Sequence, residues 1–101
     1  MNFGMMKQLQ QMQAKMAKIQ TELGLETVEA SVGGGAVTIT ITGHMKVQTV
    51  KIAPEVVDPA DVGMLEDLMV AAMNEAVEKA QKLGQERMAS VTGGLKIPGL
   101  G

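Results

Sequence analysis

Few side chains in this 101-residue sequence could catalyse a reaction or bind a metal. There is no cysteine, and the single histidine, His44, lies in an expected turn without a second histidine to share a zinc ion. Ser31 and Ser90 have no histidine or acid at a spacing typical of nucleophilic catalysis. We therefore expect no catalytic residue, no metal, no cofactor and no small-molecule substrate.

Two segments resemble phosphate-binding loops only superficially. Residues 33–35 are three glycines, and residues 92–96 read Thr-Gly-Gly-Leu-Lys. Neither has the spacing Gly-x4-Gly-Lys-Ser/Thr, and neither leads from a strand into a helix. Both are interpreted as turns. Paired carboxylates such as Glu66 and Asp67 are expected on a solvated helix face, where nothing indicates a role in general acid–base catalysis.

The charged residues are unevenly distributed along the chain, which has a formal net charge of −2 and a pI of about 5.3. Residues 1–21 carry Lys7, Lys15 and Lys18 and no acid, whereas residues 54–78 carry seven acids and no base. Residues 79–101 are basic again, with a net charge of +3. The two basic ends can therefore create a local positive field on a protein that is acidic overall.

The N-terminal basic residues are expected on a long helix from residue 4 to residue 23, ended by Gly24. Its apolar residues are spaced alternately by four and three positions, which is typical of a heptad seam. This seam consists of Met5, Leu9, Met12, Met16, Ile19 and Leu23. Because about twenty residues span about 30 Å, we expect the helix to project from the body of the domain.

Residues 26–53 change to the two-residue period of strands. Val37, Ile39 and Ile41 alternate with threonines, and glycine-containing turns separate three such runs. A change of phase near Gln48 and Thr49 predicts a β-bulge. The segment is therefore expected to form a three-stranded antiparallel meander with one apolar face.

A second helix is predicted over residues 58–91, with Asp58 as N-cap, Pro59 as the first helical residue and Asp61 in the first turn. The helix is apolar nearly all round, so one side is expected to cover the sheet and the other to meet a second copy of the chain. The residues assigned to the dimer interface are Leu65, Leu68, Met69, Ala72, Met73 and Ala76.

These elements predict a single α+β domain over residues 1–101. It comprises a helical arm at 1–24, a sheet at 26–53, a helix at 58–91 and a tail at 92–101. The longest fully apolar run, residues 68–73, is too short to span a bilayer, and the N-terminus does not read as a signal peptide. A cytoplasmic location is therefore expected.

Several short motifs occur together and in order along nearly the whole chain. They are Met5-Met6-Lys7-Gln8, Pro54-Glu55, Val57-Asp58-Pro59, Met64-Leu65-Glu66-Asp67-Leu68, Ala71-Ala72-Met73-Asn74-Glu75-Ala76, Thr92-Gly93-Gly94-Leu95 and Ile97-Pro98-Gly99. In these motifs the sequence resembles the YbaB/EbfC family of bacterial nucleoid-associated proteins. The resemblance implies a homodimer with protruding helical arms that binds double-stranded DNA in the nucleoid and contributes to chromosome organisation and gene regulation.

If the protein binds DNA, the basic residues and nearby amides are the expected contacts. They are Lys7, Gln8, Gln11, Lys15, Lys18, Lys79, Lys82, Arg87 and Lys96. One arginine and one aromatic residue provide little base recognition, so binding is expected to be largely independent of sequence. An alternative interpretation remains, in which the lysines only solvate the helix and the Met-rich seam binds a partner protein, as in a chaperone-like module.

Overall fold

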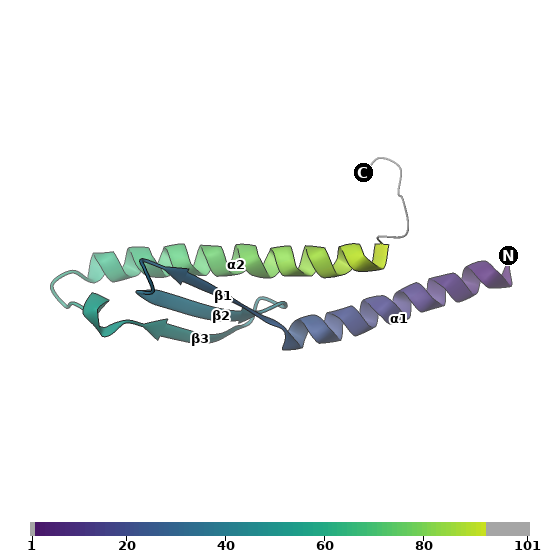
Figure 1. Ribbon diagram of the computed structural model, residues 1–101, viewed down its shortest axis with the longest axis horizontal. Coiled ribbons are helices and arrows are strands. Elements are labelled where there is room, and N and C mark those ends of the chain that lie inside the picture. Colours follow the sequence, from purple (N-terminus) through teal and green to yellow (C-terminus); the bar gives the residue numbers. More distant parts are fainter. Residues whose placement is uncertain (1, 93–101) are drawn as a thin grey trace, which may run out of the picture.

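The computed structural model describes residues 2–92, which form two helices and a three-stranded sheet (Figure 1). The order is α1 (Phe3–Leu25), β1 (Thr27–Val32), β2 (Val37–Thr42), β3 (Val47–Ile52), the short 3₁₀ helix η1 (Pro54–Val56) and α2 (Val62–Thr92). This arrangement confirms the predicted α+β class with its long N-terminal helix, sheet and C-terminal helix. Lys96 and the rest of the predicted tail after Thr92 lie outside the described residues.

The sheet is an antiparallel meander in the order β1-β2-β3. Thr40 of β2 is opposite Thr49 of β3, but the next residue, Ile41, is opposite Val47, so Gln48 has no partner in the register. This irregularity confirms the predicted bulge near Gln48. The β1–β2 turn contains Gly33, Gly34 and Gly35, all with positive φ angles, which is a conformation that glycine adopts without steric cost.

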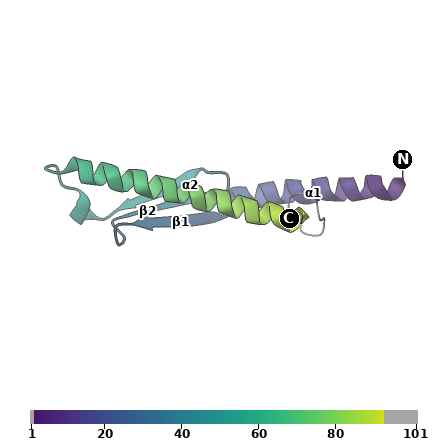
Figure 2. The same ribbon diagram turned by 90° about the horizontal axis from the view of Figure 1, so that it is seen from above.

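α2 packs along one face of the sheet, over β1 and β2 (Figures 1 and 2). The core between them is built from small residues on the helix and branched residues on the sheet, which allows a close approach of the two layers. Its fully or almost fully buried members are Ala30, Val37, Ile39, Ile41, Ala72, Ala76 and Ala80.

α1 runs beyond the end of the sheet and beyond the C-terminal end of the described part of α2 (Figure 1). The molecule is therefore elongated, with extents of 69 × 27 × 17 Å and a radius of gyration of 19.3 Å. A compact domain of this length would have a radius of gyration of about 13 Å.

The end of α1 differs from the prediction. The helix passes through Gly24 and ends at Leu25, and Glu26 then takes an extended conformation. Gly24 serves close packing rather than a left-handed stop, because a Cβ atom there would lie 3.1 Å from two atoms of the His44 ring. The hairpin that carries His44 therefore packs directly on the last turn of α1.

The start of α2 also differs, because the helix begins at Val62 and not at Asp58. Asp58 instead forms a turn, in which its carboxylate accepts a hydrogen bond from the backbone N–H of Ala60 at 2.9 Å. Asp61 takes the capping role, since its Oδ1 accepts from the backbone N–H of Met64 at 3.3 Å. The predicted N-cap was wrong because both Asp58 and Asp61 are suitable capping residues, and the helix uses the one that lies closer to Val62.

Candidate nucleic-acid interface

The apolar seam of α1 is covered only near the sheet. Leu23, at the C-terminal end of the seam, is 3% exposed, whereas Leu9 and Met5 are 56% and 59% exposed. α2 ends beside the middle of α1 (Figure 1), so Met12 is half-buried while Met5 and Leu9 are left largely uncovered by the described residues.

The outer face of α1 carries basic and amide side chains. Lys7, Gln11 and Lys18 are spaced by four and seven residues, which places them on one line of the helix, opposite the seam. All three are exposed. Gln8 and Lys15 are also exposed and lie between this line and the seam. The helix thus brings together the five candidate residues predicted near the N-terminus.

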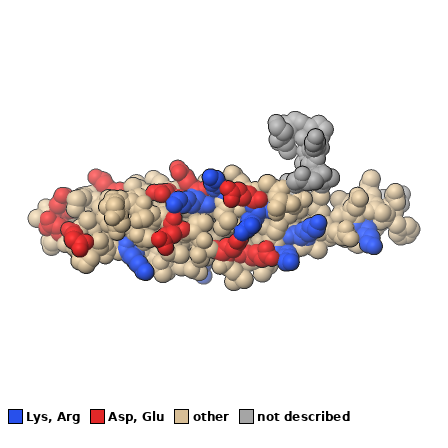
Figure 3. Space-filling model, viewed as in Figure 1, with Lys and Arg blue, Asp and Glu red and all other residues tan. Residues whose placement is uncertain are grey.

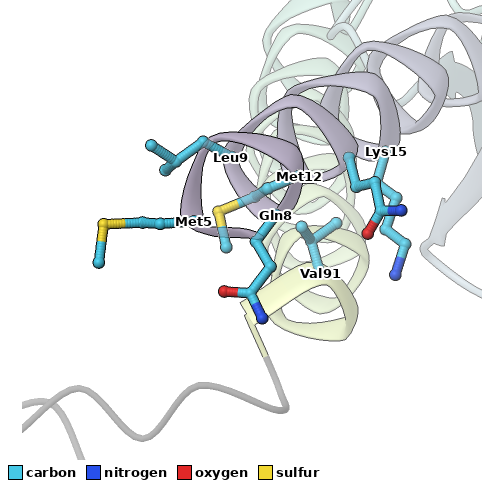
Figure 4. Close-up of a pocket in the computed structure, with 7 residues that line it drawn as sticks. Met5, Gln8, Leu9, Met12, Lys15 and Val91 are labelled. Atoms are coloured by element: carbon cyan, nitrogen blue, oxygen red, sulfur yellow. The ribbon is translucent and has the colours of Figure 1, made fainter. Parts of the chain in front are cut away.

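Among the described residues, two grooves lie between α1 and the end of α2. The larger has a volume of about 380 Å³ and combines apolar and polar side chains, with Val91 of α2 facing α1 (Figure 4). Its lining residues are Met5, Gln8, Leu9, Gln11, Met12, Lys15 and Val91. The second groove, about 310 Å³, lies beside Lys15, Lys18 and Glu22. Lys15 therefore borders both grooves.

Two basic residues of α2, Lys79 and Arg87, contact acidic or carbonyl groups. Lys79 donates a hydrogen bond to the backbone oxygen of Glu29 at 2.9 Å and pairs with Glu75 at 3.5 Å. Lys82 lies four residues from both Glu78 and Glu86, so carboxylates flank it on the same helix face. The structure does not bring these two lysines to the outer face of α1.

Arg87 of α2 forms a bidentate pair with Glu26. Its Nε donates to Glu26 Oε2 at 2.9 Å, and its Nη2 donates to Glu26 Oε1. Hydrogen bonding to Arg87 lowers the pKa of Glu26, and desolvation of the carboxylate opposes this effect to a smaller extent. The same hydrogen bond raises the pKa of Arg87, so both groups are charged at neutral pH. The charge of Arg87 is therefore already paired with a carboxylate within the chain.

The two ends of the molecule differ in charge, whereas acidic and basic side chains are mixed between them (Figure 3). Acidic side chains gather at the end where α2 begins, whereas the opposite end of the visible face carries basic side chains (Figure 3). Because residues 2–21 contain no acid, the positive field of α1 is not cancelled within its own N-terminal turns.

The residues predicted to form a dimer interface separate into two groups. Ala72 and Ala76 are fully buried against this chain's own sheet, so they are not available to a second subunit. Leu65, Leu68, Met69 and Met73 are half-buried at the edges of the same core. The assignment of the two alanines is therefore withdrawn, because they face the inside of the domain.

Sequence reasoning missed an apolar strip on β3. Val50 and Ile52 lie opposite the core residues Ile39 and Val37, on the sheet face that α2 covers, yet they are 42% and 39% exposed. They are exposed because α2 packs over β1 and β2 rather than over β3. The phase of β3 already indicated an apolar face, but the sequence did not indicate which part of the sheet α2 would cover.

Two classes of site receive no support within the part of the chain that the structure describes. No group of three or more histidine, cysteine or acidic side chains is arranged to hold a metal ion. Neither α1 nor α2 has a stretch that is both long and apolar enough to cross a membrane.

A sequence model of the YbaB/EbfC DNA-binding family matches residues 1–95. The chain is 53% identical over 92 residues to a nucleoid-associated protein of Chloroflexus aurantiacus, covering 91% of this chain and 92% of that protein. It is 48% identical over 98 residues to a nucleoid-associated protein of Syntrophobacter fumaroxidans, covering 97% and 89% respectively.

The fold also has a solved counterpart. The crystal structure of an uncharacterized protein from Helicobacter pylori matches with a TM-score of 0.71 at 15% sequence identity, covering 95% of this chain and 99% of that chain. At this level of identity the match concerns the fold alone.

Proposed function

The chain belongs to the YbaB/EbfC DNA-binding family, and we propose that it binds double-stranded DNA as a homodimer through the basic outer face of α1. The family is one of nucleoid-associated DNA-binding proteins rather than an enzyme family. The observation that carries the proposal is the line of Lys7 and Lys18 on an exposed helix face free of acids up to Glu22.

The geometry of this face suits phosphate contacts. Lys7 and Lys18 are eleven residues apart, which is about 17 Å along the helix. Phosphates repeat about every 3.4 Å of helix axis on one DNA strand, so the two lysines would contact separate phosphates. Lys15 lies beside them, and the amides of Gln8 and Gln11 add hydrogen-bond donors.

Binding of this kind depends little on base sequence. Lysine ammonium groups contact phosphates as point charges, whereas the bidentate contact of arginine with guanine is the usual specific one. The single arginine, Arg87, is already paired with Glu26. The glutamines provide at most a mild preference through adenine edges.

The homodimer would form on the uncovered apolar strip. Lys79 reaches β1, so by helical geometry Met73, Val77 and Val70 project from α2 toward the side of β3. Val50 and Ile52 lie on that side of the sheet and are exposed on the face that α2 covers, so these side chains would together offer an apolar surface to a second copy. A second copy that covered this surface by two-fold symmetry would also protect the exposed edge of β3.

The names of the relatives suggest the cellular role. Proteins at about 50% identity are called nucleoid-associated, so we place this protein in the nucleoid, within the cytoplasm. Dimers that bind DNA with little sequence preference would contribute to chromosome organisation and, by occupying promoters among other sites, to gene regulation.

A matched pair of variants tests the DNA surface. Lys7→Ala with Lys18→Ala removes two charges from α1, whereas Lys46→Ala with Lys51→Ala removes two exposed lysines from the β2–β3 hairpin. For each α1 of the dimer that contacts the DNA, the α1 variant should bind a random duplex at 0.1 M salt about 60-fold more weakly, because that helix no longer neutralises two phosphates. The hairpin variant should be weakened much less. Equal effects in the two variants would refute the assignment to α1.

A second candidate function, binding of a partner helix, is favoured by one observation. The groove of about 380 Å³ is lined by Met5, Leu9 and Met12, and flexible methionine surfaces accommodate varied helices. Salt separates the two functions, because DNA binding by lysines weakens steeply with added salt whereas apolar capture does not.

A further inference from the structure

Glu26 is the single residue that joins α1 to β1. It caps α1, with its own backbone N–H donating to the carbonyl of Glu22 at 2.9 Å, and its φ and ψ angles of −78° and 144° turn the chain into the strand. Its carboxylate is held by Arg87, which lies 61 residues later on α2. The pair therefore connects the base of α1 to the second helix.

The pair lies at the base of α1, so a small rotation of the helix there displaces the lysines on its outer face by a larger distance. Lys18 is eight residues before Glu26, about 12 Å along the helix, and Lys7 is nineteen residues before it, about 28 Å. A rotation of α1 by 10° about its base would move Lys7 by about 5 Å, which exceeds the length of a hydrogen bond. Small changes at Glu26 thus become large changes at the proposed phosphate contacts.

We propose that the Glu26–Arg87 pair is a positioning device that sets the direction of α1 relative to α2, so that Arg87 serves DNA binding through Glu26 rather than by contacting phosphate. This inference rests on the proposed DNA-binding function. A bidentate arginine–carboxylate pair has a defined geometry, unlike a lysine pair, so it suits an orienting role. Gln20 Nε2 of α1 also contacts Met88 Sδ of α2, at 3.9 Å, near this point.

The competing hypothesis is that Glu26 merely masks Arg87, which would contact DNA when released. The two hypotheses predict opposite effects of Glu26→Gln. Glu86→Gln is the matched control, because it removes one carboxylate next to Arg87 without removing a hydrogen bond among the described residues. Comparison of these variants cancels the general effect of removing one negative charge.

DNA affinity is measured by fluorescence anisotropy with a labelled random duplex over a salt series. If the pair positions α1, Glu26→Gln should bind more weakly than Glu86→Gln, by about eightfold at 0.1 M salt for each phosphate that α1 no longer reaches, with a shallower salt slope. The charge-swapped double variant Glu26→Arg with Arg87→Glu should restore much of the affinity. Tighter binding and a steeper slope in Glu26→Gln would overturn the proposal, as would values equal to those of Glu86→Gln.

A distance measurement separates failure of this inference from failure of DNA binding. Because the sequence has no cysteine, Gln10→Cys with Gln85→Cys gives two unique spin-label sites on α1 and α2. Labelled chain is diluted with unlabelled chain, so that pulsed electron resonance reports distances within one chain. Glu26→Gln should broaden the distance distribution and the charge swap should narrow it again. An unchanged distribution would overturn the positioning role whether or not the protein binds DNA.

Discussion

The backbone N–H of Gly43 donates a hydrogen bond to the carbonyl oxygen of Leu23 at 2.9 Å, which attaches the β2–β3 turn to the last turn of α1. A Cβ atom on Gly43 would lie only 2.6 Å from that oxygen and 2.8 Å from Leu23 Cδ2. Any other residue at this position would push α1 away from the sheet. The contact therefore fixes the base of the helix that carries the proposed DNA surface.

We expect Gly43→Ala to destabilise the protein by about 2–4 kcal/mol, because it adds a steric overlap and breaks a backbone hydrogen bond. Thermal unfolding followed by circular dichroism measures this change. Gly84→Ala is the control, since nothing lies within 4 Å of its Cβ position inside α2. That substitution should stabilise the helix by about 0.5–1 kcal/mol. An unchanged free energy of unfolding in Gly43→Ala would contradict this prediction, because it would show that the turn can move away from α1 at little cost.

The Glu26–Arg87 pair predicts a pH dependence. The pKa of Glu26 is lowered in the folded protein by its hydrogen bond to Arg87, so the stabilisation from the pair is complete above the unfolded value of about 4.3. It is lost as the pH falls through the lower folded value. The melting temperature of the wild type should therefore exceed that of Glu26→Gln modestly at pH 7, and this difference should shrink as the pH is lowered from about 4 to about 2. A difference that stays constant between these pH values would contradict this assignment.

The proposed dimer surface is tested at Val70. This side chain is 61% exposed in one chain, so Val70→Glu should leave the fold of the chain intact. If Val70 lies in the interface, the charge would be buried without a partner and the dimer would dissociate. Light scattering should then give a mass near 10.6 kDa for the variant and twice that for the wild type. Phe3→Glu, at 88% exposure, is the control that should remain dimeric.

Sequence preference is expected to be weak. We predict that the affinity for the tightest duplex found by selection exceeds the affinity for a random duplex of equal length by less than about 10³-fold at fixed salt. Specific regulators typically exceed that ratio. The measurement is a competition assay with both duplexes in the same buffer. A greater preference would require base contacts that the lysines of α1 do not provide.

The elements of the fold were largely predictable from local patterns. The alternation of Val37, Ile39 and Ile41 with threonine identifies the central strand, and the phase change at Gln48 identifies the bulge. The α1 face that carries Lys7 and Lys18 also follows from spacing alone. These features depend on residues within a few turns or one strand of each other.

Apart from the local choice between Asp58 and Asp61 at the start of α2, the errors concern contacts between distant parts of the chain. Gly24 was interpreted as a helix stop, but its role depends on His44, and the role of Gly43 depends on Leu23. In the β2–β3 turn the positive φ angle falls on Met45 rather than on a glycine. The burial of Ala72 and the exposure of β3 likewise depend on where α2 crosses the sheet, which no local pattern reveals.

The central claim, electrostatic DNA binding by a homodimer, is tested most directly by the salt dependence of wild-type affinity for a random duplex. About four to six phosphate contacts per dimer predict a slope of about −4 to −5 when log K is plotted against log salt concentration. The series should run from about 50 to 200 mM salt, a range over which the dimer is monitored by light scattering. A slope near zero, or no measurable binding at the lowest salt concentration, would contradict the account.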